Sequence, residues 1–433
     1  MVSPPSFRNA AAPALVAAIA FASRALWTLY VRFDPLANGR FDDSVFYHEA
    51  ARYVARGEGL INPWSGLPTA LWPPGYPFFL GALYRIFPDD PLVAGLANAL
   101  LGGAAALGVY ALGRAAGGVV AGLASGLTFA LLPGQVVFSS LTMSETLSTA
   151  TLVFLALAAL RWNPARRGPV AALALGAGVG MAAFVRGQAL ILLPVFGLFW
   201  WLRGAPWKQT LLWGTLATFG ALAVLAPWAA RNLRELGRPI LVSSNLGGNL
   251  WMGHHDGATG GMDPHVYPES FDHLPPERQE AARAQAMLED GLRFMVTHPL
   301  EEARLAVNKV RLLWESDTVG FDWNEGYGRT PIFDDERGET VRAATNGAYF
   351  AVLALGAAGL LVGAARRNAA AALLTLLAAL WTAGHVLFFG DPRFHVPVMF
   401  AVCVGVGVTA GVGVELARRL AGRKPRLLFA GAS

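Results

Sequence analysis

Two adjacent carboxylates, Asp42 and Asp43, open a segment in which apolar residues recur with helical spacing. If this segment forms a helix, Asp43 and Tyr47 are four residues apart and share a face. A carboxylate can act as a general base that takes the proton of an attacking hydroxyl group. An Asp pair before a helix is also typical of an N-terminal cap, so both interpretations stay open for these residues.

A second acidic candidate is Glu145, the only charged residue between Arg114 and Arg161. The apolar residues that follow it predict a membrane span that begins near position 144. An ionisable group at the end of a span is costly unless it faces water or a partner. Glu145 is therefore a candidate for an active site, with a helix-capping carboxylate as the alternative.

Three arginines are candidates for binding an anionic substrate. Arg186 and Arg393 lie in short turns between predicted spans, and a guanidinium group binds phosphate oxygens through a fork of N–H donors. The alternatives are contacts with lipid headgroups or, for Arg393, neutralisation by Asp391. Arg24 lies about 10 Å inside the first predicted span. It either lines the same cavity or, as we favour, extends its side chain to the membrane surface.

Neither a metal nor a nucleotide cofactor is predicted. The region around position 260 is rich in imidazole and carboxylate groups, but their spacing follows no regular ligand pattern: His254, His255, Asp256, Asp263 and His265. A divalent cation therefore stays only an alternative. The glycine-rich run 245–261 contains no G-x-x-x-x-G-K-[ST] motif, which excludes a nucleotide-binding P-loop.

The composition defines the class of protein that must position these residues. Of 433 residues, 54% are hydrophobic and 15% are charged, and several charge-free runs are long enough to cross a bilayer. The sequence predicts an all-α polytopic membrane protein of about ten spans, near 10–31, 91–113, 117–139, 144–162, 169–185, 187–202, 209–230, 344–365, 369–388 and 394–415. The net charge of +5 comes from basic residues at the ends of apolar runs, so no nucleic-acid partner is expected.

The distribution of Lys and Arg predicts the orientation. On the side of the termini, the connections and the tail hold fourteen basic residues, whereas the short turns on the other side hold only Arg186 and Arg393, which places both termini in the cytoplasm. We therefore expect residues 1–230 to form a membrane module whose first outer loop, 32–90, carries the catalytic motif. Residues 231–343 are expected to form a second outer loop, and 344–433 further spans with a basic cytoplasmic tail. The expected location is the inner (plasma) membrane, with the active site on its outer, periplasmic face.

Short elements are expected within both outer loops. The apolar segment 74–87 is too short to span and predicts an interfacial or re-entrant helix. Residues 276–296 predict an amphipathic helix that begins at a proline, followed by a second helix to about Trp314. Residues 239–242 are a strand candidate, and 245–253 are too rich in glycine for a predicted helix.

The first loop resembles that of a known family. The pattern D-x-x-x-Y at Asp43 and Tyr47, followed by A-x-x-x-x-x-G-x-G and W-P-P-G-Y-P-x-x-L, is similar to the first outer loop of C-type glycosyltransferases. The nearest types would be the protein O-mannosyltransferases and the lipid A aminoarabinose transferases. The resemblance implies that Asp43 is the catalytic base, with Asp42 beside it, and that Glu145 is a second acidic residue at the cavity. Tyr47, Tyr76 and Arg24 are the expected cavity residues.

The resemblance implies a transferase that moves a hexose or pentose from a polyprenyl-phosphate donor to a protein, lipid or glycan acceptor. The expected partners are this donor, the acceptor and the bilayer, without a cofactor. A transporter or flippase of lipid-linked saccharides is the alternative, and an inactive relative that only binds a partner is a third. Transporters place ionisable residues near the membrane midplane, whereas here the candidate charges gather at the outer ends of the spans.

Overall fold

The computed structural model describes residues 7–37, 39, 42–262, 267–327 and 332–422. Within these residues every regular element is a helix, apart from one isolated β-bridge between Ile61 and Pro68. The predicted all-α class is confirmed. The backbone of a membrane span must satisfy its hydrogen bonds internally, which is why the apolar segments fold as helices.

The described helices include five that are long and apolar enough to cross a membrane. These are Ala11–Val31 within α1 (Phe7–Val31), α4 (Pro91–Leu131), α10 (Trp207–Leu236), α15 (Asp335–Ala365) and Pro392–Leu420, which comprises η3 (Pro392–Val398) and α17 (Met399–Leu420). Shorter apolar helices are α8 (Pro169–Val185), the segment Gly187–Leu202 with η2 (Gly187–Ile191) and α9 (Leu192–Leu202), and α16 (Ala369–His385). The protein is thus a membrane protein, and the count of ten spans stays a prediction.

One long element, α4, is a helical hairpin. Its backbone leaves the helical region at Gly117 and Gly118, and Gly118 has φ +80° and ψ −167°. The two halves then run back along each other, since a Cβ atom on Gly122 would lie 3.0 Å from the Tyr110 carbonyl oxygen. The turn therefore lies slightly beyond the predicted break between 113 and 117, at the glycine pair that can adopt this backbone conformation.

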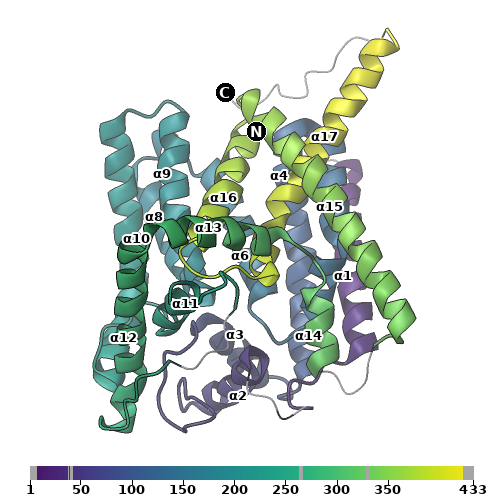
Figure 1. Cartoon of the computed structure of the whole chain (residues 1–433). Helices are drawn as coiled ribbons and strands as arrows, with labels where there is room; N and C mark the ends of the chain where they lie inside the picture. The colour runs from purple at the N-terminus through teal and green to yellow at the C-terminus, as the bar shows by residue number, and fades with distance from the viewer. Residues whose placement is uncertain (1–6, 38, 40–41, 263–266, 328–331, 423–433) are drawn as a thin grey trace.

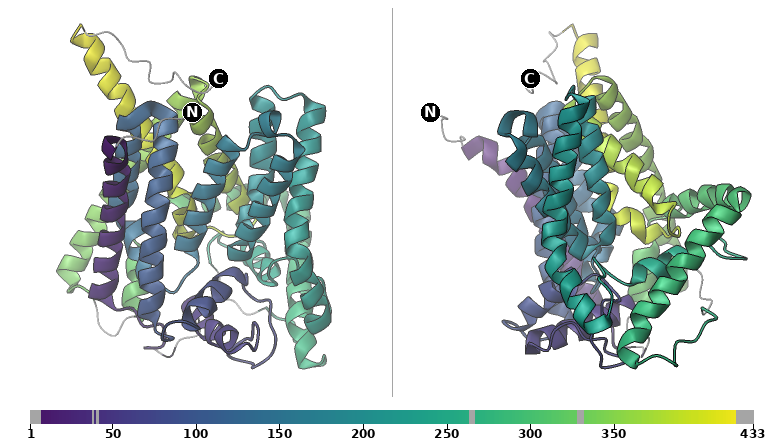
Figure 2. Two further views of the ribbon diagram at one scale, coloured as in Figure 1. Left: turned by 180° about the vertical axis from the view of Figure 1, so that it is seen from behind. Right: turned by 90° about the vertical axis from the view of Figure 1, so that its left-hand side faces the viewer.

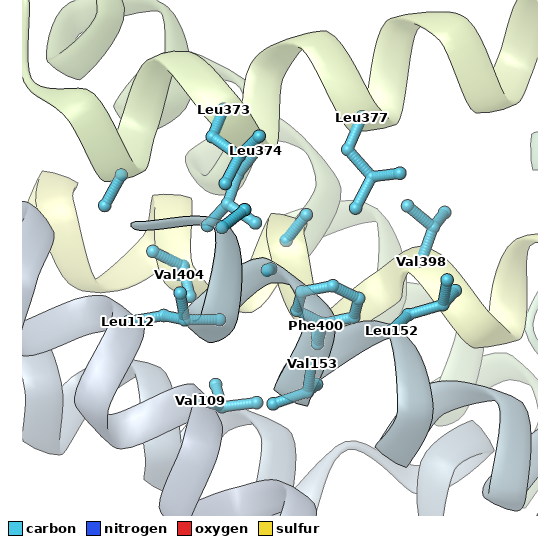
Figure 3. Packing of buried hydrophobic residues seen from close by; sticks show 14 of the residues in the cluster. Val109, Leu112, Leu152, Val153, Leu373, Leu374, Leu377, Val398, Phe400 and Val404 are labelled. Atoms are coloured by element: carbon cyan, nitrogen blue, oxygen red, sulfur yellow. The ribbon is translucent and has the colours of Figure 1, made fainter. Parts of the chain in front are cut away.

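The largest core lies between α4, α6 (Glu145–Arg161), α16 and α17. Figure 3 shows this packing, in which Val109 and Leu112 of α4 face Val153 of α6 and Phe400 of α17. Small residues allow the helices to approach closely: a Cβ atom on Gly359 of α15 would lie 1.9 Å from the Gly405 carbonyl oxygen of α17. Close helix packing through small residues is typical of membrane proteins.

Helices of the two long loops gather at one end of the bundle. The first loop contains α2 (Asp43–Arg56) and α3 (Gly75–Tyr84), and both lie at the end opposite to the start of α1 and the end of α17 (Figures 1 and 2). The second loop contains α11 (Asn245–Gly253), α12 (Pro276–Thr297), α13 (Pro299–Trp314) and α14 (Val319–Tyr327). The helices predicted at 74–87, 276–296 and up to Trp314 are confirmed.

Two local predictions for the second loop are wrong. Residues 245–253 form the helix α11 despite their glycines. The glycines bring the helix against neighbouring backbone: a Cβ atom on Gly247 would lie 1.9 Å from the Ala284 carbonyl oxygen, and one on Gly253 would lie 2.0 Å from that of Phe388. Residues 239–242 form no strand, and no neighbouring strand exists in the described part of the chain. The division of the chain at 230 and 343 stays a prediction.

Candidate active site

The first turn of α2 positions the acidic pair. Asp42 is the N-cap, and its Oδ1 accepts hydrogen bonds from the backbone N–H groups of Ser44 (2.7 Å) and Val45 (3.2 Å). Asp43 is the first residue of the helix and is not the cap, so its carboxylate is directed elsewhere. The capping interpretation is thus confirmed for Asp42, whereas a catalytic function of either residue stays a prediction.

Asp43 forms an ion pair with Arg393, a residue 350 positions away in the sequence. Nη1 of Arg393 donates to Oδ2 of Asp43 at 2.7 Å, and the two side chains are 13% and 22% exposed, respectively. Asp391, the predicted neutralising partner, is a second and more distant ion partner of Arg393, and it also caps η3 by accepting a hydrogen bond from the Arg393 backbone N–H at 2.8 Å. Its carboxylate lies 4.0 Å from Nε of Arg393. The guanidinium therefore orients the Asp43 carboxylate while leaving part of it exposed.

A second ion pair joins the other two candidates. Nη1 of Arg186, which immediately follows α8, donates to Oε1 of Glu145 at 2.7 Å and to Oγ of Ser144 at 3.1 Å. The side chain of Glu145 is 1% exposed and that of Arg186 is 10% exposed. Removing one member of such a buried pair leaves an uncompensated charge, so the two residues depend on each other.

The two tyrosines lie next to these ion pairs. Tyr47 is buried one turn after Asp43, and its ring contacts that of Tyr76 with 5.1 Å between centroids. Burial, reinforced by the nearby charge of Asp43, raises the pKa of Tyr47 well above its ordinary value. The hydroxyl group of Tyr76 accepts a hydrogen bond from Nδ2 of Asn98 at 3.3 Å. Tyr47 is therefore a neutral hydrogen-bonding group beside the charges.

Several residues that hold this arrangement were not predicted. Asn98 donates from Nδ2 to the carbonyl oxygens of Ser139 (3.2 Å) and Leu141 (3.0 Å), which fixes the segment leading to Glu145. The Phe394 ring lies 5.5 Å from the guanidinium carbon of Arg186 and 5.1 Å from that of Arg393. It thus links the two arginines through cation–π contacts. Only its position next to Arg393 could have indicated Phe394 in the sequence.

Arg24 does not extend to the membrane surface, so the favoured interpretation of this residue is wrong. Its side chain is 1% exposed, and Nη1 and Nη2 donate to the carbonyl oxygens of Ala20, Ala130 and Phe129 at 3.0–3.1 Å. The carbonyl groups of Phe129 and Ala130 lie at the C-terminal end of α4, where a cation is favourable. None of these contacts joins Arg24 to the two ion pairs. Its function as a cavity residue stays a prediction.

The described residues contain no group of His, Cys, Asp or Glu side chains placed to hold a metal. His254 is buried and donates from Nδ1 to Oε1 of Glu302 at 2.8 Å, and the His255 ring stacks on Trp251. Asp263 and His265 lie outside the described residues. The need for a divalent cation is untested.

An apolar cavity of about 1020 Å³ lies between α3, α4, α6, α8 and α10. Three of its lining residues are close in sequence to site residues: Val185 precedes Arg186, Gly75 precedes Tyr76, and Leu147 follows Glu145 by two positions. Because the same helix ends supply both, the cavity adjoins the charged residues. The rest of the lining consists mainly of aliphatic and aromatic side chains, including Phe154, Met181 and Trp228.

The ion pairs leave hydrogen-bonding atoms unused. Nε of Arg186, Nε of Arg393 and Oε2 of Glu145 are buried and make no hydrogen bond within the described residues. Buried donors and acceptors of this kind normally have a partner, so each marks a position where a ligand or water would be favourable. A largely buried group of two cations beside an apolar cavity is suited to a molecule with an anionic head and a hydrocarbon tail.

Comparison with known families gives a match over part of the chain. Residues 72–230 match the family model described as dolichyl-phosphate-mannose-protein mannosyltransferase. Among curated protein sequences there is no significant match.

Solved structures of the oligosaccharyltransferase from Archaeoglobus fulgidus are similar in fold. The apo form is 16% identical with a TM-score of 0.51, over 96% of this chain and 53% of that chain. The complex of the same archaeal enzyme, AglB, with an inhibitory peptide and a dolichol-phosphate is 16% identical with a TM-score of 0.50, over 98% and 53%. This chain thus spans about half the length of the solved structures it matches. The comparison shows that this chain is similar in fold to the archaeal oligosaccharyltransferase.

Proposed function

We propose that this chain, with its C-type glycosyltransferase fold, transfers a hexose or pentose from a polyprenyl-phosphate donor to an acceptor hydroxyl or amine. The observation that carries the proposal is the ion pair of Asp43 and Arg393 beside that of Glu145 and Arg186, at one end of the apolar cavity. The fold supports the reaction class, and the cavity supports a lipid-linked donor. The acceptor is a protein, lipid or glycan on the outer face of the membrane.

Asp43 is the proposed general base. The acceptor group attacks the anomeric carbon of the sugar, its proton passes to the Asp43 carboxylate, and the bond from that carbon to the phosphate oxygen breaks. The phosphate leaves as an anion and needs no general acid, so one base suffices. The ion pair with Arg393 fixes the carboxylate, whose 22% exposure leaves an oxygen accessible to the acceptor. Asp42 supports this geometry by capping α2.

Arg186 and Arg393 are the proposed ligands of the donor phosphate. Each already uses Nη1 for a carboxylate, and each has an unused Nε donor. A phosphate near these groups would receive hydrogen bonds from fixed cations, and the negative charge that develops on the leaving group would be stabilised. Glu145 keeps Arg186 in place, and Tyr47 and Tyr76 form the wall next to the sugar.

The apolar cavity would hold the first isoprene units of the donor. A polyprenyl chain buries apolar surface there with a gain of about 25 cal/mol per Å². Filling the cavity through Thr151→Trp should therefore raise the KM for a long-chain donor. The KM for a donor analogue without isoprene units should change little. Leu211→Trp on α10, which lies outside the cavity lining and is exposed, is the matched control.

The test of the function is an assay with purified protein, membrane extract and a panel of radiolabelled polyprenyl-phosphate sugars. The proposal expects label to move from one or more donors to an identifiable acceptor. The donor that is used defines the sugar, and the labelled product defines the acceptor. Movement of intact labelled donor between the leaflets of a vesicle, without any transfer, would instead establish a flippase and contradict the proposal.

A further inference from the structure

The helix α13 has two apolar faces, and only one of them packs on the protein. Leu305, Lys309 and Leu313 are buried on the inner face. On the opposite face Leu300 is 88% exposed and Val307 is 72% exposed. Such large apolar side chains on a helix that is otherwise well packed need a partner of their own.

On the exposed face of α13, side chains of different chemistry follow one another around the helix axis. With 3.6 residues per turn, Ala303, Val307 and Val310 form an apolar edge, and Arg304 and Arg311 come next to it. Glu301 and Asn308 follow on the far side of the arginines. The sequence of side chains from one edge to the other is therefore apolar, cationic, then acidic or polar. This gradient is typical of a helix that lies in a membrane interface.

The position of α13 agrees with that environment. It packs against η3 and α16, the elements that form the outer ends of two membrane helices, and it crosses the spans instead of running along them (Figure 1). The corner between α12 and α13 projects away from the bundle in the side view of Figure 2. The apolar surface continues over this corner, because Leu292 and Val296 on α12 are 48% and 82% exposed.

The arginines on this face are not neutralised by any residue that the structure describes. No ion pair of Arg304 or Arg311 exists among the described residues, and Arg311 donates only to its neighbour Asn308, from Nε to Oδ1 at 3.0 Å. Arg304 and Arg311 are seven residues, or about two helical turns, apart beside the apolar edge. Their guanidinium groups are suited to binding the oxygens of phosphodiester anions.

We propose that α13 and the end of α12 form a membrane-binding surface whose Arg304 and Arg311 bind the headgroups of anionic phospholipids. The apolar edge enters the boundary between headgroups and acyl chains, and the edge with Glu301 and Asn308 faces water. The surface anchors the second loop at a fixed depth next to the segment that carries Arg393. This inference concerns the bilayer and does not depend on the proposed glycosyl transfer.

Depth is measured with single spin labels on the full-length protein in nanodiscs. Cys403 is buried, so labels are introduced at Val307→Cys and, as the matched control on the same helix, at Asn308→Cys. The label at 307 should collide mainly with oxygen, which concentrates in lipid, and the label at 308 mainly with a water-soluble nickel complex. Equal water accessibility at both positions would overturn the proposal. A short distance between labels at 307 in two copies would also overturn it, since the face would then be a dimer interface.

Lipid selectivity is measured as the retention of phosphatidylglycerol relative to phosphatidylcholine in native mass spectra. The double variant Arg304→Gln/Arg311→Gln should lose about fivefold in this preference for each arginine removed. Arg278→Gln/Arg283→Gln in the first half of α12 removes the same charge from exposed positions outside the surface and should keep the preference. An unchanged preference in the first variant, or an equal loss in the second, would contradict the inference.

Discussion

Lys309 illustrates how single charges are accommodated in this protein. Its side chain is 1% exposed, and Nζ donates to Nε2 of His254 at 2.9 Å and to the Val386 carbonyl oxygen at 3.1 Å. His254 in turn donates from Nδ1 to Glu302, so the lysine reaches a carboxylate only through the imidazole. Burial lowers the pKa of Lys309 from its ordinary 10.5 to about 8, and burial also lowers the pKa of His254.

This lowered pKa predicts a pH-dependent stability. Between about pH 8 and 10.5 the unfolded chain binds the Lys309 proton more tightly than the folded protein does. The free energy of unfolding therefore rises with pH across this window through this group. Lys309→Met removes the contribution, so the Tm of wild type minus that of the variant should increase from pH 7.5 to pH 10. Thermal unfolding in detergent measures it, and a constant or decreasing difference would contradict the account.

The ion pairs of the site show what the sequence could not predict. Asp43, Glu145, Arg186 and Arg393 were recognised as candidates because charges are rare near apolar spans. Their pairing was not predictable, because Asp43 and Arg393 are brought together only by the packing of η3 near the start of α2. The contact of Arg24 with the carbonyl groups of Phe129 and Ala130 was not predictable for the same reason, because these groups lie at the far end of the α4 hairpin.

At the scale of elements, helices were predicted well where an apolar run is bounded by a proline or a charged residue. The span at 169–185 agrees with α8, which begins at Pro169 and ends just before Arg186. The helix α11 was missed because its glycines are unfavourable in an isolated helix and favourable only against the backbone of Ala284 and Phe388. When tertiary contacts stabilise a helix that has a low intrinsic helix propensity, the sequence shows no periodic pattern that would predict it.

The turn within α4 gives a prediction at the same scale. A side chain at Gly118 meets no atom within 4 Å, so only its left-handed backbone (φ +80°) opposes substitution. Gly118→Ala should therefore lower the free energy of unfolding by about 1–3 kcal/mol. Gly214→Ala on α10 is the control, since its surroundings are also open but its backbone is helical, and it should be neutral or slightly stabilising. Equal Tm values for the two variants in detergent would contradict the hairpin geometry.

At the scale of the whole molecule, the two terminal helix ends and the first loop lie at opposite ends of the bundle. The start of α1 and the end of α17 lie at one end, and the first loop with Asp43 lies at the other (Figure 1). When the two long loops are left out, basic residues are concentrated in the connections on the side of the termini, which is the side expected to face the cytoplasm. Substrate and acceptor would thus meet on the outer face of the membrane.

This topology is tested with a membrane-impermeant maleimide on intact cells. Cysteines at the exposed positions Ser65 and Glu269 in the two long loops should be labelled, whereas one at the exposed Lys208, on the opposite side, should react only after lysis. The native Cys403 is buried and gives little background. Labelling of position 208 in intact cells, or protection of position 65, would reverse the orientation.

The central claim, that Asp43 is the base of glycosyl transfer, is tested most directly by the single-turnover rate of Asp43→Asn with bound donor. The amide keeps the size of the side chain and an oxygen for Arg393, and the cap of α2 is supplied by Asp42. Asp42→Asn is the matched control, because Asn caps a helix as well as Asp does. The account predicts a loss of about 10²–10⁴-fold for Asp43→Asn, with donor affinity and Tm preserved, and a change of only a few fold for Asp42→Asn. A folded Asp43→Asn protein that transfers sugar at the wild-type rate would contradict it.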